Sequence, residues 1–253
     1  GYFYIATSHF HRDDLLEHNP RMLMERQVDG IIAVDSQIRF ESASPVVSVA
    51  GHEEIKGVTN VVLNHHIAAE LGVGHLYDLG HRKIAFIKGQ DFSNDTAVRW
   101  ETIMAAADKR GIVVDSSLTA QLVGDIGTPE IGYIAAKKIL AHQKPFTALF
   151  AFNDISAIGA IRALQEAGLR VPEDVSVLGF DDIYAAEFHN PALTTIRQPL
   201  FEMGELAGQT LLNAISKNNI IDEIPQTLTV EPELVIRCST ATAKRLKSVK
   251  QPT

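Results

Sequence analysis

Short apolar runs alternate along the chain with longer segments in which apolar residues recur at helical spacing. The short, β-branched runs predict strands at Tyr2–Thr7, Gly30–Val34, Val46–Val49, Val58–Leu63, Lys83–Lys88, Leu118–Val123, Ala148–Phe152 and Val175–Phe180. The longer segments predict helices at Asp14–Arg26, His66–Leu79, Ala97–Arg110, Pro129–Ala141, Ile155–Ala167 and Leu200–Ser216. Because this alternation is typical of parallel sheets covered by helices on both faces, we expect an α/β fold.

Local signals agree with this pattern and show where it changes. Thr128 and Pro129 offer an N-cap and a first-turn proline to the helix that follows. After Pro225, the runs Gln226–Val230 and Glu233–Arg237 predict two strands with no helix between them. Since no linker rich in Pro, Gly or Ser divides the chain, two lobes would have to be joined by several short crossings.

Composition narrows the class of protein. The 253 residues are 45% apolar and 21% charged, which is ordinary for a soluble globular protein. The formal net charge of −8 makes the chain by itself a poor partner for DNA phosphates. The single cysteine, Cys238, favours a reducing compartment, so we expect a cytoplasmic location. The basic run Lys244–Lys250 is typical of a solvated tail, and Gly1 in place of Met indicates that the native N-terminus lies elsewhere.

Motifs of the common enzyme classes are missing from the sequence. There is no phosphate loop and no Gly-x-Ser-x-Gly turn, and Gly72-Val73-Gly74 lacks the third glycine of a dinucleotide site. The histidines lack metal-ligand spacing and are interpreted as surface or capping residues: His65, His66, His75 and His81. We therefore expect no catalytic residue, no cofactor and no metal. An enzyme acting on a sugar or nucleoside, with Asp181 as general base, is the least favoured alternative.

Polar residues follow the predicted strands at their carboxyl ends. They are Ser93, Asn94 and Asp95, then Asp125, then Asn153 and Asp154, and finally Asp181 and Asp182. Ligands of open parallel sheets bind beyond these ends. Arg99 lies in the first turn of a following helix, so its guanidinium, Asn153 and Asp181 predict a site for a polyhydroxylated ligand. Asp154 and Asp182 are interpreted instead as a helix cap and the start of a turn.

Several strings around these residues are similar to the effector-binding core of the LacI/GalR family of bacterial transcription regulators. The strings are Leu79–Ile87 (LGHRKIAFI), Phe152–Asp154 with Ala157–Ala160, Val171–Asp182 (VPEDVSVLGFDD), Pro191–Pro199 (PALTTIRQP) and Glu233–Arg237. They span nearly the whole chain in the family's order. Together they are far more specific than any one of them.

The resemblance implies a type I periplasmic-binding-protein-like fold, in which two Rossmann-like lobes with parallel sheets are joined by a multi-strand hinge. The first lobe is expected to hold residues 1–63 and 197–225, without its first strand–helix unit. The second is expected to hold residues 64–196 and 226–240, followed by a tail at 241–253. The implied hinge residues are Leu63, Asn64, Thr195, Ile196 and Gln198, with Leu193–Ile196 as an extended connector between the lobes.

The family pattern also implies which residues contact the ligand. The matching positions are Asp95, Arg99, Ile126, Asn153 and Asp181. Three departures leave the ligand's identity open. Ile126 stands where an aromatic ring often stacks, the family's Arg-x-x-Gly-aromatic string reads Arg99–Ile103 (RWETI), and Ala50 and Gly51 stand where a polar residue is common.

By resemblance, the protein is a non-catalytic, homodimeric regulator. Its small polar effector, a sugar or sugar derivative bound in the cleft between the lobes, would control the binding of operator DNA by an N-terminal head domain that this sequence does not include. The alternative is an extracytoplasmic sugar-binding protein of an uptake system, which a secretion signal in the complete gene would favour.

Overall fold

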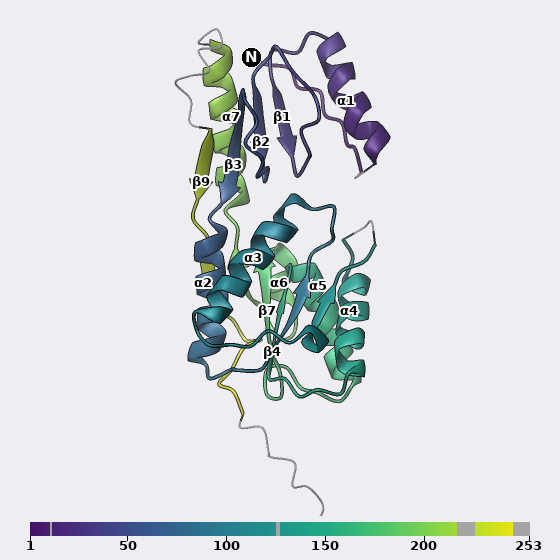
Figure 1. Ribbon diagram of the computed structural model, residues 1–253, viewed down its shortest axis with the longest axis vertical. Helices are drawn as coiled ribbons and strands as arrows, with labels where there is room; N and C mark the ends of the chain where they lie inside the picture. The colour runs from purple at the N-terminus through teal and green to yellow at the C-terminus, as the bar shows by residue number, and fades with distance from the viewer. Residues whose placement is uncertain (11, 125–126, 217–225, 245–253) are drawn as a thin grey trace, which may run out of the picture. The chain divides into compact units, whose positions relative to one another are not determined.

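The computed structural model describes residues 1–10, 12–124, 127–216 and 226–244, and it forms two compact units (Figure 1). The first unit comprises Gly1–Asn64, Asp91–Ala97 and Pro199–Glu231. The second comprises His65–Gln90, Val98–Gln198 and Pro232–Thr253. The α/β class with parallel sheets is confirmed, and the chain passes between the units at several short crossings.

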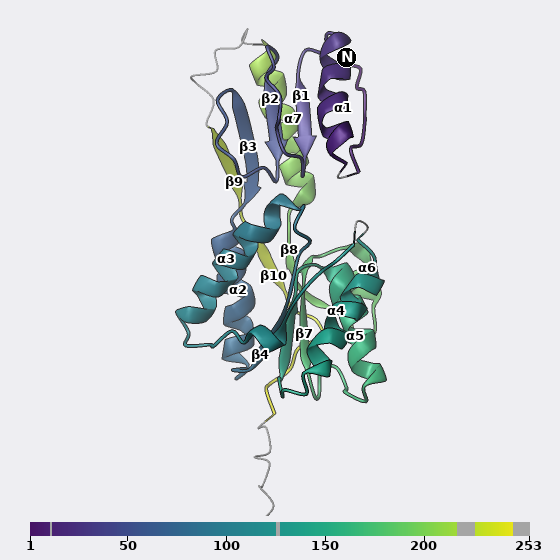
Figure 2. The same cartoon turned by 45° about the vertical axis from the view of Figure 1, so that its right-hand side comes forward.

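The first unit is built on a parallel sheet, which in the described part of the chain has the strand order β1-β2-β3-β9. The strands are β1 (Ile31–Val34), β2 (Val46–Val49), β3 (Val58–Leu63) and β9 (Thr227–Val230), and the helices are α1 (Asp13–Glu25) and α7 (Leu200–Ser216). Figure 2 shows α7 behind β1 and β2 and α1 beside β1. β2 and β3 are buried along their whole length, as expected of central parallel strands.

The second unit contains a larger sheet, whose described strands follow the order β10-β8-β7-β6-β4-β5. The strands are β4 (Ile84–Lys88), β5 (Thr119–Gln121), β6 (Ala148–Ala151), β7 (Ser176–Asp181), β8 (Thr194–Arg197) and β10 (Glu233–Val235). The helices are α2 (His65–Asp78), α3 (Asn94–Asp108), α4 (Pro129–Ala141), α5 (Asp154–Glu166) and α6 (Tyr184–Phe188), with a 3-10 turn, η1, at Ser116–Leu118. Neighbouring strands are parallel except β10, which runs antiparallel to β8.

Alternate residues of the central strands pack against helices on opposite faces of this sheet. Leu149 and Val177 belong to the core cluster that includes Ile161 of α5. Phe150, the next residue of β6, faces α2 instead, where Gly72 makes room for its ring because a Cβ there would lie 2.8 Å from the ring carbons. The apolar strands are therefore covered on both faces, with α4 and α5 on one side and α2 on the other (Figure 1).

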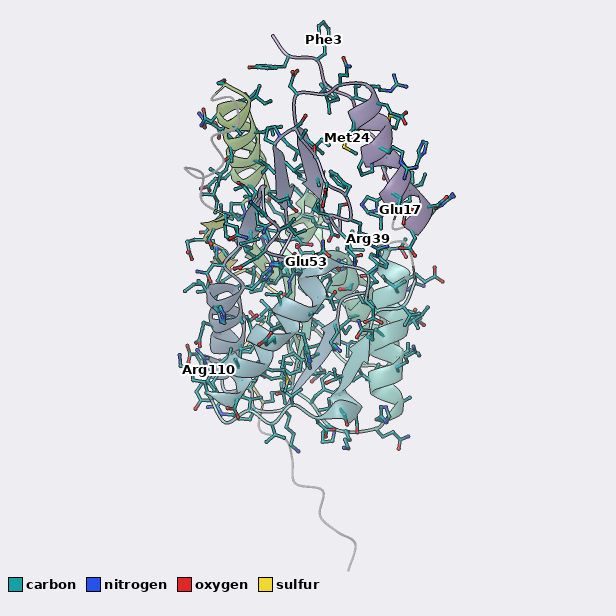
Figure 3. All side chains as sticks on the ribbon, turned by 45° about the horizontal axis from the view of Figure 1, so that its top comes forward. Phe3, Glu17, Met24, Arg39, Glu53 and Arg110 are labelled. Carbon is teal, nitrogen blue, oxygen red and sulfur yellow. The ribbon has the colours of Figure 1, made fainter. Side chains whose placement is uncertain are left out.

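Most predicted elements are confirmed to within a few residues, but the strand predicted at Tyr2–Thr7 is wrong. This segment is irregular, and the Phe3 side chain is fully exposed (Figure 3). An apolar run becomes a strand only when a neighbouring strand supplies backbone partners. Among the described residues, β1 at the edge of the first sheet pairs only with β2. The short helix α6 and the turn η1 were not predicted.

The structure corrects two of the predicted lobe assignments and one predicted connector. β9, predicted in the second lobe, pairs with β3 in the first sheet. Asp91–Ala97 groups with the first unit, although it interrupts the second along the sequence. Leu193–Ile196, predicted as a connector, instead mostly forms β8, which lies between β7 and β10 in the second sheet. These segments are short, so the unit to which each belongs is set by its neighbours in space and not by its local sequence pattern.

The tail predicted from residue 241 is also shorter than expected. The backbone N–H of Ala243 donates to the carbonyl of Leu79 at 2.8 Å, and Lys244 pairs with Asp174 at 2.9 Å, so residues 241–244 belong to the second unit. The remainder of the predicted tail lies outside the described residues. Within the described chain, every helix is too short or too polar to cross a membrane.

Candidate ligand-binding site

The carboxyl edge of the second sheet carries several of the predicted site residues, whereas Asp125, also predicted from a strand end, lies outside the described residues. Asn153 follows β6, Asp181 is the last residue of β7, and α3 follows β4 and carries Arg99. β4, β6 and β7 are parallel neighbours, so their carboxyl ends lie side by side. The structure therefore brings Arg99, Asn153 and Asp181 to one edge, as predicted.

Arg99 is held in place from two sides. Its side chain is buried, and one terminal nitrogen donates to the carbonyl oxygen of Phe152 at 2.7 Å. The guanidinium carbon lies 3.7 Å from the ring centroid of Phe180 and 4.4 Å from that of Phe152. Stacking on two rings fixes the plane of the guanidinium, so its donors are pre-oriented for a hydroxyl or carboxylate.

Asp95 lies one helical turn before Arg99 on α3. Its Oδ1 atom is 2.7 Å from Nε2 of His52, and both residues belong to the first unit. The backbone N–H of Asn94, at the start of the same helix, donates to Asp35 at 3.2 Å. The amino end of α3 therefore carries a carboxylate that its hydrogen bond with His52 holds in position.

Asn153 caps α5, and this corrects the prediction that Asp154 does so. The Asn153 Oδ1 atom accepts from the backbone N–H of Ser156 at 2.9 Å, and the Ser156 hydroxyl completes a capping box. The cap uses the oxygen of Asn153 and leaves its amide NH2 as the group that can serve a ligand. Asp154 is the first residue of α5, but its carboxylate contacts other elements.

Asp181 and Asp182 have an unusual backbone. Their φ angles are +108° and +59°, a region that side-chain-bearing residues rarely adopt. Gln198 stabilises Asp181, because its side-chain amide donates to Asp181 Oδ1 at 2.5 Å. Non-glycine residues in this region cluster at ligand sites, where the surrounding structure compensates for the strain.

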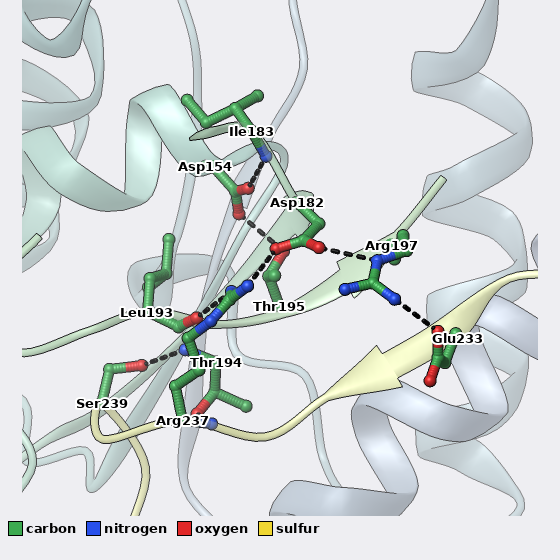
Figure 4. A network of polar contacts seen from close by, with 10 residues as sticks. All are labelled: Asp154, Asp182, Ile183, Leu193, Thr194, Thr195, Arg197, Glu233, Arg237 and Ser239. Carbon is green, nitrogen blue, oxygen red and sulfur yellow. Dashed lines mark hydrogen bonds and ion pairs between the residues drawn. The ribbon is translucent and has the colours of Figure 1, made fainter. Parts of the chain in front are cut away.

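Two ion pairs and one buried carboxyl lie around Asp182 (Figure 4). Asp182 lies 2.7 Å from Arg197 and 2.7 Å from Arg237, so its charge is compensated. Asp154 beside it is fully buried. Burial raises the pKa of Asp154 to about 7, against the lowering effect of hydrogen bonds from Thr195 and Ile183; the charges of Asp181 and Asp182 raise it further.

The other residues implied by the resemblance fall in several places. Ile126 lies outside the described residues. Leu63 ends β3, and Asn64 follows it with its side-chain amide donating to Glu231 at 3.0 Å. Thr195 and Ile196 are fully buried inside β8. Sequence reasoning missed the two aromatic rings around Arg99, because their apolar strand positions look like ordinary core.

Comparison with known proteins agrees with this geometry. The profile of the periplasmic binding protein-like domain matches residues 73–240. The HTH-type transcriptional repressor PurR of Haemophilus influenzae is 32% identical over 246 residues, which are 94% of this chain and 72% of the relative.

Solved structures show the same similarity. The complex of the transcriptional regulator CelR with cellobiose has a TM-score of 0.80 and 27% identity, covering 90% of this chain and 70% of that one. A sugar-binding transcriptional regulator of the LacI family from Escherichia coli, complexed with phosphate, has a TM-score of 0.75 and 27% identity, covering 89% and 82%.

The two α/β units and the polar edge of the second sheet define a periplasmic-binding-protein-like domain of type I. The relatives place it more narrowly, since they are named as repressors and regulators and not as enzymes. The chain belongs to the LacI/GalR family of transcription regulators and spans the effector-binding core of that family.

Proposed function

We propose that the carboxyl edge of the second sheet binds a sugar or sugar derivative, and that this ligand controls how the intact regulator binds operator DNA. The observation that carries the proposal is the fixed Arg99 guanidinium, stacked on Phe180 and Phe152 beside Asn153 and Asp181. A pre-oriented donor beside acceptors suits vicinal hydroxyls, each of which donates and accepts one hydrogen bond.

Each proposed ligand residue has a distinct role. Arg99 donates from its fork, the Asn153 amide donates from the helix cap, and the carboxylates of Asp95 and Asp181 accept from hydroxyls. Support for a sugar comes from the similar regulators, one solved with cellobiose and one described as sugar-binding. Ile126 stays part of the proposal only by its place in the sequence.

Transmission would use the segments at which the chain passes between the units. Leu63–Asn64 and Gln198 lie at two of these crossings, and we retain them as hinge residues. Thr195 and Ile196 are less suited to this role, because β8 pairs with strands on both sides. Like other regulators of its family, the protein would act in the cytoplasm as a homodimer, with operator DNA bound by a head domain.

The ligand class can be tested with the tryptophan that follows Arg99. Trp100 is the only tryptophan in the sequence, so its fluorescence reports on the site without a label. Cellobiose, D-ribose, adenosine and guanosine are titrated separately. We expect one of the two sugars to change the fluorescence of Trp100. Thermal melts with the same compounds should show a rise in Tm that depends on ligand concentration.

Variants of Arg99 then locate the site. We expect Arg99→Ala to weaken binding of the responding sugar at least about tenfold, because hydrogen bonds from charged groups contribute ~1.5–3 kcal/mol. Arg99→Lys retains the charge without the fork and should weaken binding nearly as much. Arg162→Ala, an exposed arginine on α5, is the matched control. Unchanged affinity in both Arg99 variants would remove this residue from the site, and a response to the nucleosides alone would replace the sugar as ligand class.

A further inference from the structure

Asp154 carries a buried carboxyl that is not among the ligand contacts proposed above. Its side chain is shielded completely from solvent, although it sits next to the helix cap Asn153. A buried carboxyl without a compensating role is costly, so its contacts indicate what it does. The contacts are two: the hydroxyl of Thr195 lies 2.6 Å from Oδ1, and the backbone N–H of Ile183 donates to Oδ2 at 2.9 Å (Figure 4).

These contacts join three elements of the second unit. Asp154 begins α5, Ile183 follows the turn at the end of β7, and Thr195 lies in the middle of β8. The space for the carboxyl is built into β7, because a Cβ on Gly179 would lie 2.1 Å from Oδ1 of Asp154. Because Gly179 has no side chain, it leaves the space in this buried strand that the Asp154 carboxyl occupies.

The bond to Ile183 acts on the strained turn. Asp181 and Asp182 both have positive φ, and each residue in such a conformation costs ~1–3 kcal/mol unless its surroundings hold it. The Ile183 N–H is the first backbone donor after these two residues, and Asp154 is the side chain that accepts from it. Asp154 thus fixes the end of the turn that presents Asp181.

We propose that Asp154 is a positioning residue that latches the Asp181–Ile183 turn onto α5 and β8, and that its proton sets how firmly the latch holds. The proposal rests on the proposed function in one respect only, namely that Asp181 contacts the ligand. In the neutral form, the carboxyl can donate to Thr195 Oγ1 and accept from Ile183 at the same time. In the ionised form it accepts from both, but as a buried charge.

The groups that face Asp154 favour the neutral form. Asp181 and Asp182 bring like charge from the end of β7, and Arg197 and Arg237 are engaged by Asp182. Opening the turn would admit water to Asp154 and return its pKa toward 3.8 from about 7, so opening releases a proton between about pH 3.8 and pH 7. The closed turn is therefore most favoured at low pH and loosens as pH rises to about 7, with little further change above.

Hydrogen exchange at the Ile183 amide tests the latch without any ligand. We expect the protection factor, which is corrected for the intrinsic pH dependence of exchange, to fall up to about tenfold between pH 6 and pH 8. Asp154→Asn keeps an acceptor for Ile183 and a donor for Thr195 without a titrating group. This variant should show high protection with no pH dependence, whereas Asp154→Ala should show low protection at both pH values.

Glu166→Gln, at the other end of α5 and exposed, is the control and should retain the wild-type profile. If Asp154→Ala does not fold, the comparison of wild type with Asp154→Asn still tests whether the proton on Asp154 controls protection at Ile183. An identical pH profile in these two proteins would overturn the proposal. It would mean that the pH dependence of protection at Ile183 does not come from titration of Asp154.

Trp100 fluorescence with D-ribose and cellobiose separates the latch from the ligand assignment. We expect Asp154→Asn to bind whichever of these sugars the wild type binds, and Asp154→Ala to bind it more weakly. Equal affinity in the two variants would overturn the link from the latch to the site. If the wild type binds neither sugar while the exchange profile at Ile183 behaves as expected, the latch stands and the sugar assignment fails.

Discussion

At the scale of single residues, Asp154 couples the candidate site to pH through the stability of the second unit. Its folded pKa of about 7 is higher than its unfolded value near 3.8. A group with a raised folded pKa contributes stability that is fully present below the unfolded pKa and is lost as pH rises through the folded one. Each pKa unit corresponds to ~1.4 kcal/mol, so the loss between pH 4 and pH 7 is substantial.

We therefore expect Asp154→Asn to be more stable than the wild type at pH 8, by about 1 kcal/mol or more, with the difference shrinking or reversing near pH 4. Urea denaturation at several pH values, followed by circular dichroism, measures this difference. Asp174→Asn is a useful contrast. Its ion pairs with Arg170 and Lys244 lower the pKa of Asp174, so removing the carboxylate should not stabilise the protein at pH 8. A wild type that gains stability over Asp154→Asn as pH rises would contradict the expectation.

The residues of the site differ in how far the sequence reveals them. Arg99, Asn153 and Asp181 could be predicted, because polar residues at the ends of buried parallel strands meet at one edge. The role of Asp154 could not be predicted, since an Asp in the first turn of a helix has the same local pattern whether it caps that helix or bonds elsewhere. Its partner Thr195 is distant in sequence, and only the packed sheet brings the two together.

At the scale of elements, α4 and α5 make the tightest helix contact of the second unit. Their backbones touch at glycines: a Cβ on Gly159 would lie 1.8 Å from the carbonyl oxygen of Pro129, and a Cβ on Gly132 would lie 2.2 Å from that of Ser156. Backbone atoms cannot rotate away as side chains can, so any larger residue must push the helices apart. The apolar seam beneath them includes Ala135, Ala160 and Ala163, whose small side chains permit the same close approach.

Gly159→Ala should therefore destabilise the protein by about 1–3 kcal/mol, although alanine favours helices, because overpacking outweighs propensity. Gly204→Ala in α7 is the matched control. Gly204 has open space around its Cβ position, so alanine should stabilise the protein by ~0.5–1 kcal/mol. Thermal melts of both variants give the sign of each effect. A stabilised Gly159→Ala protein would show that the two helices are not in backbone contact.

Elements with strong local patterns were predictable, and those that depend on a partner were not. The helices and the central strands of both sheets repeat apolar residues at clear spacings, and their boundaries differ from prediction by a few residues. The run Tyr2–Thr7 has the same apolar pattern but no strand to pair with in the described structure. β9 and β10 are adjacent in sequence yet join different sheets, a choice that no local pattern encodes.

At the scale of the whole molecule, the last described residues complete a unit that is otherwise built from residues 65–90 and 98–198. Ser239 is fully buried, and its hydroxyl donates to Val177 at 2.6 Å while accepting from the backbone N–H of Thr194 at 2.8 Å. The carbonyl of Ala241 lies 3.0 Å from Nε2 of His81. His81 was interpreted as a surface or capping residue, but it is buried and serves this C-terminal segment.

The histidine makes the attachment sensitive to acid. Burial is the main cause that lowers the pKa of His81, so the neutral ring is favoured in the folded protein. Since the unfolded chain takes up this proton more readily, stability is lost as pH falls below the ordinary histidine pKa of ~6.5. This dependence is opposite in sign to that of Asp154. The two partly cancel in the wild type, and Asp154→Asn leaves the contribution of His81 visible.

Ser239→Ala tests whether the C-terminal segment stabilises the second unit. The substitution leaves the buried N–H of Thr194 without its hydroxyl acceptor, which should cost ~1–3 kcal/mol. Trp100 lies in the second unit, so its fluorescence during urea denaturation reports on that unit. Ser116→Ala, an exposed serine of the same unit, should change stability by less than ~0.5 kcal/mol. Equal, small effects of the two substitutions would mean that residues 65–90 and 98–198 hold together without the segment. A large effect of Ser239→Ala alone would mean that the second unit is complete only when the chain returns to it.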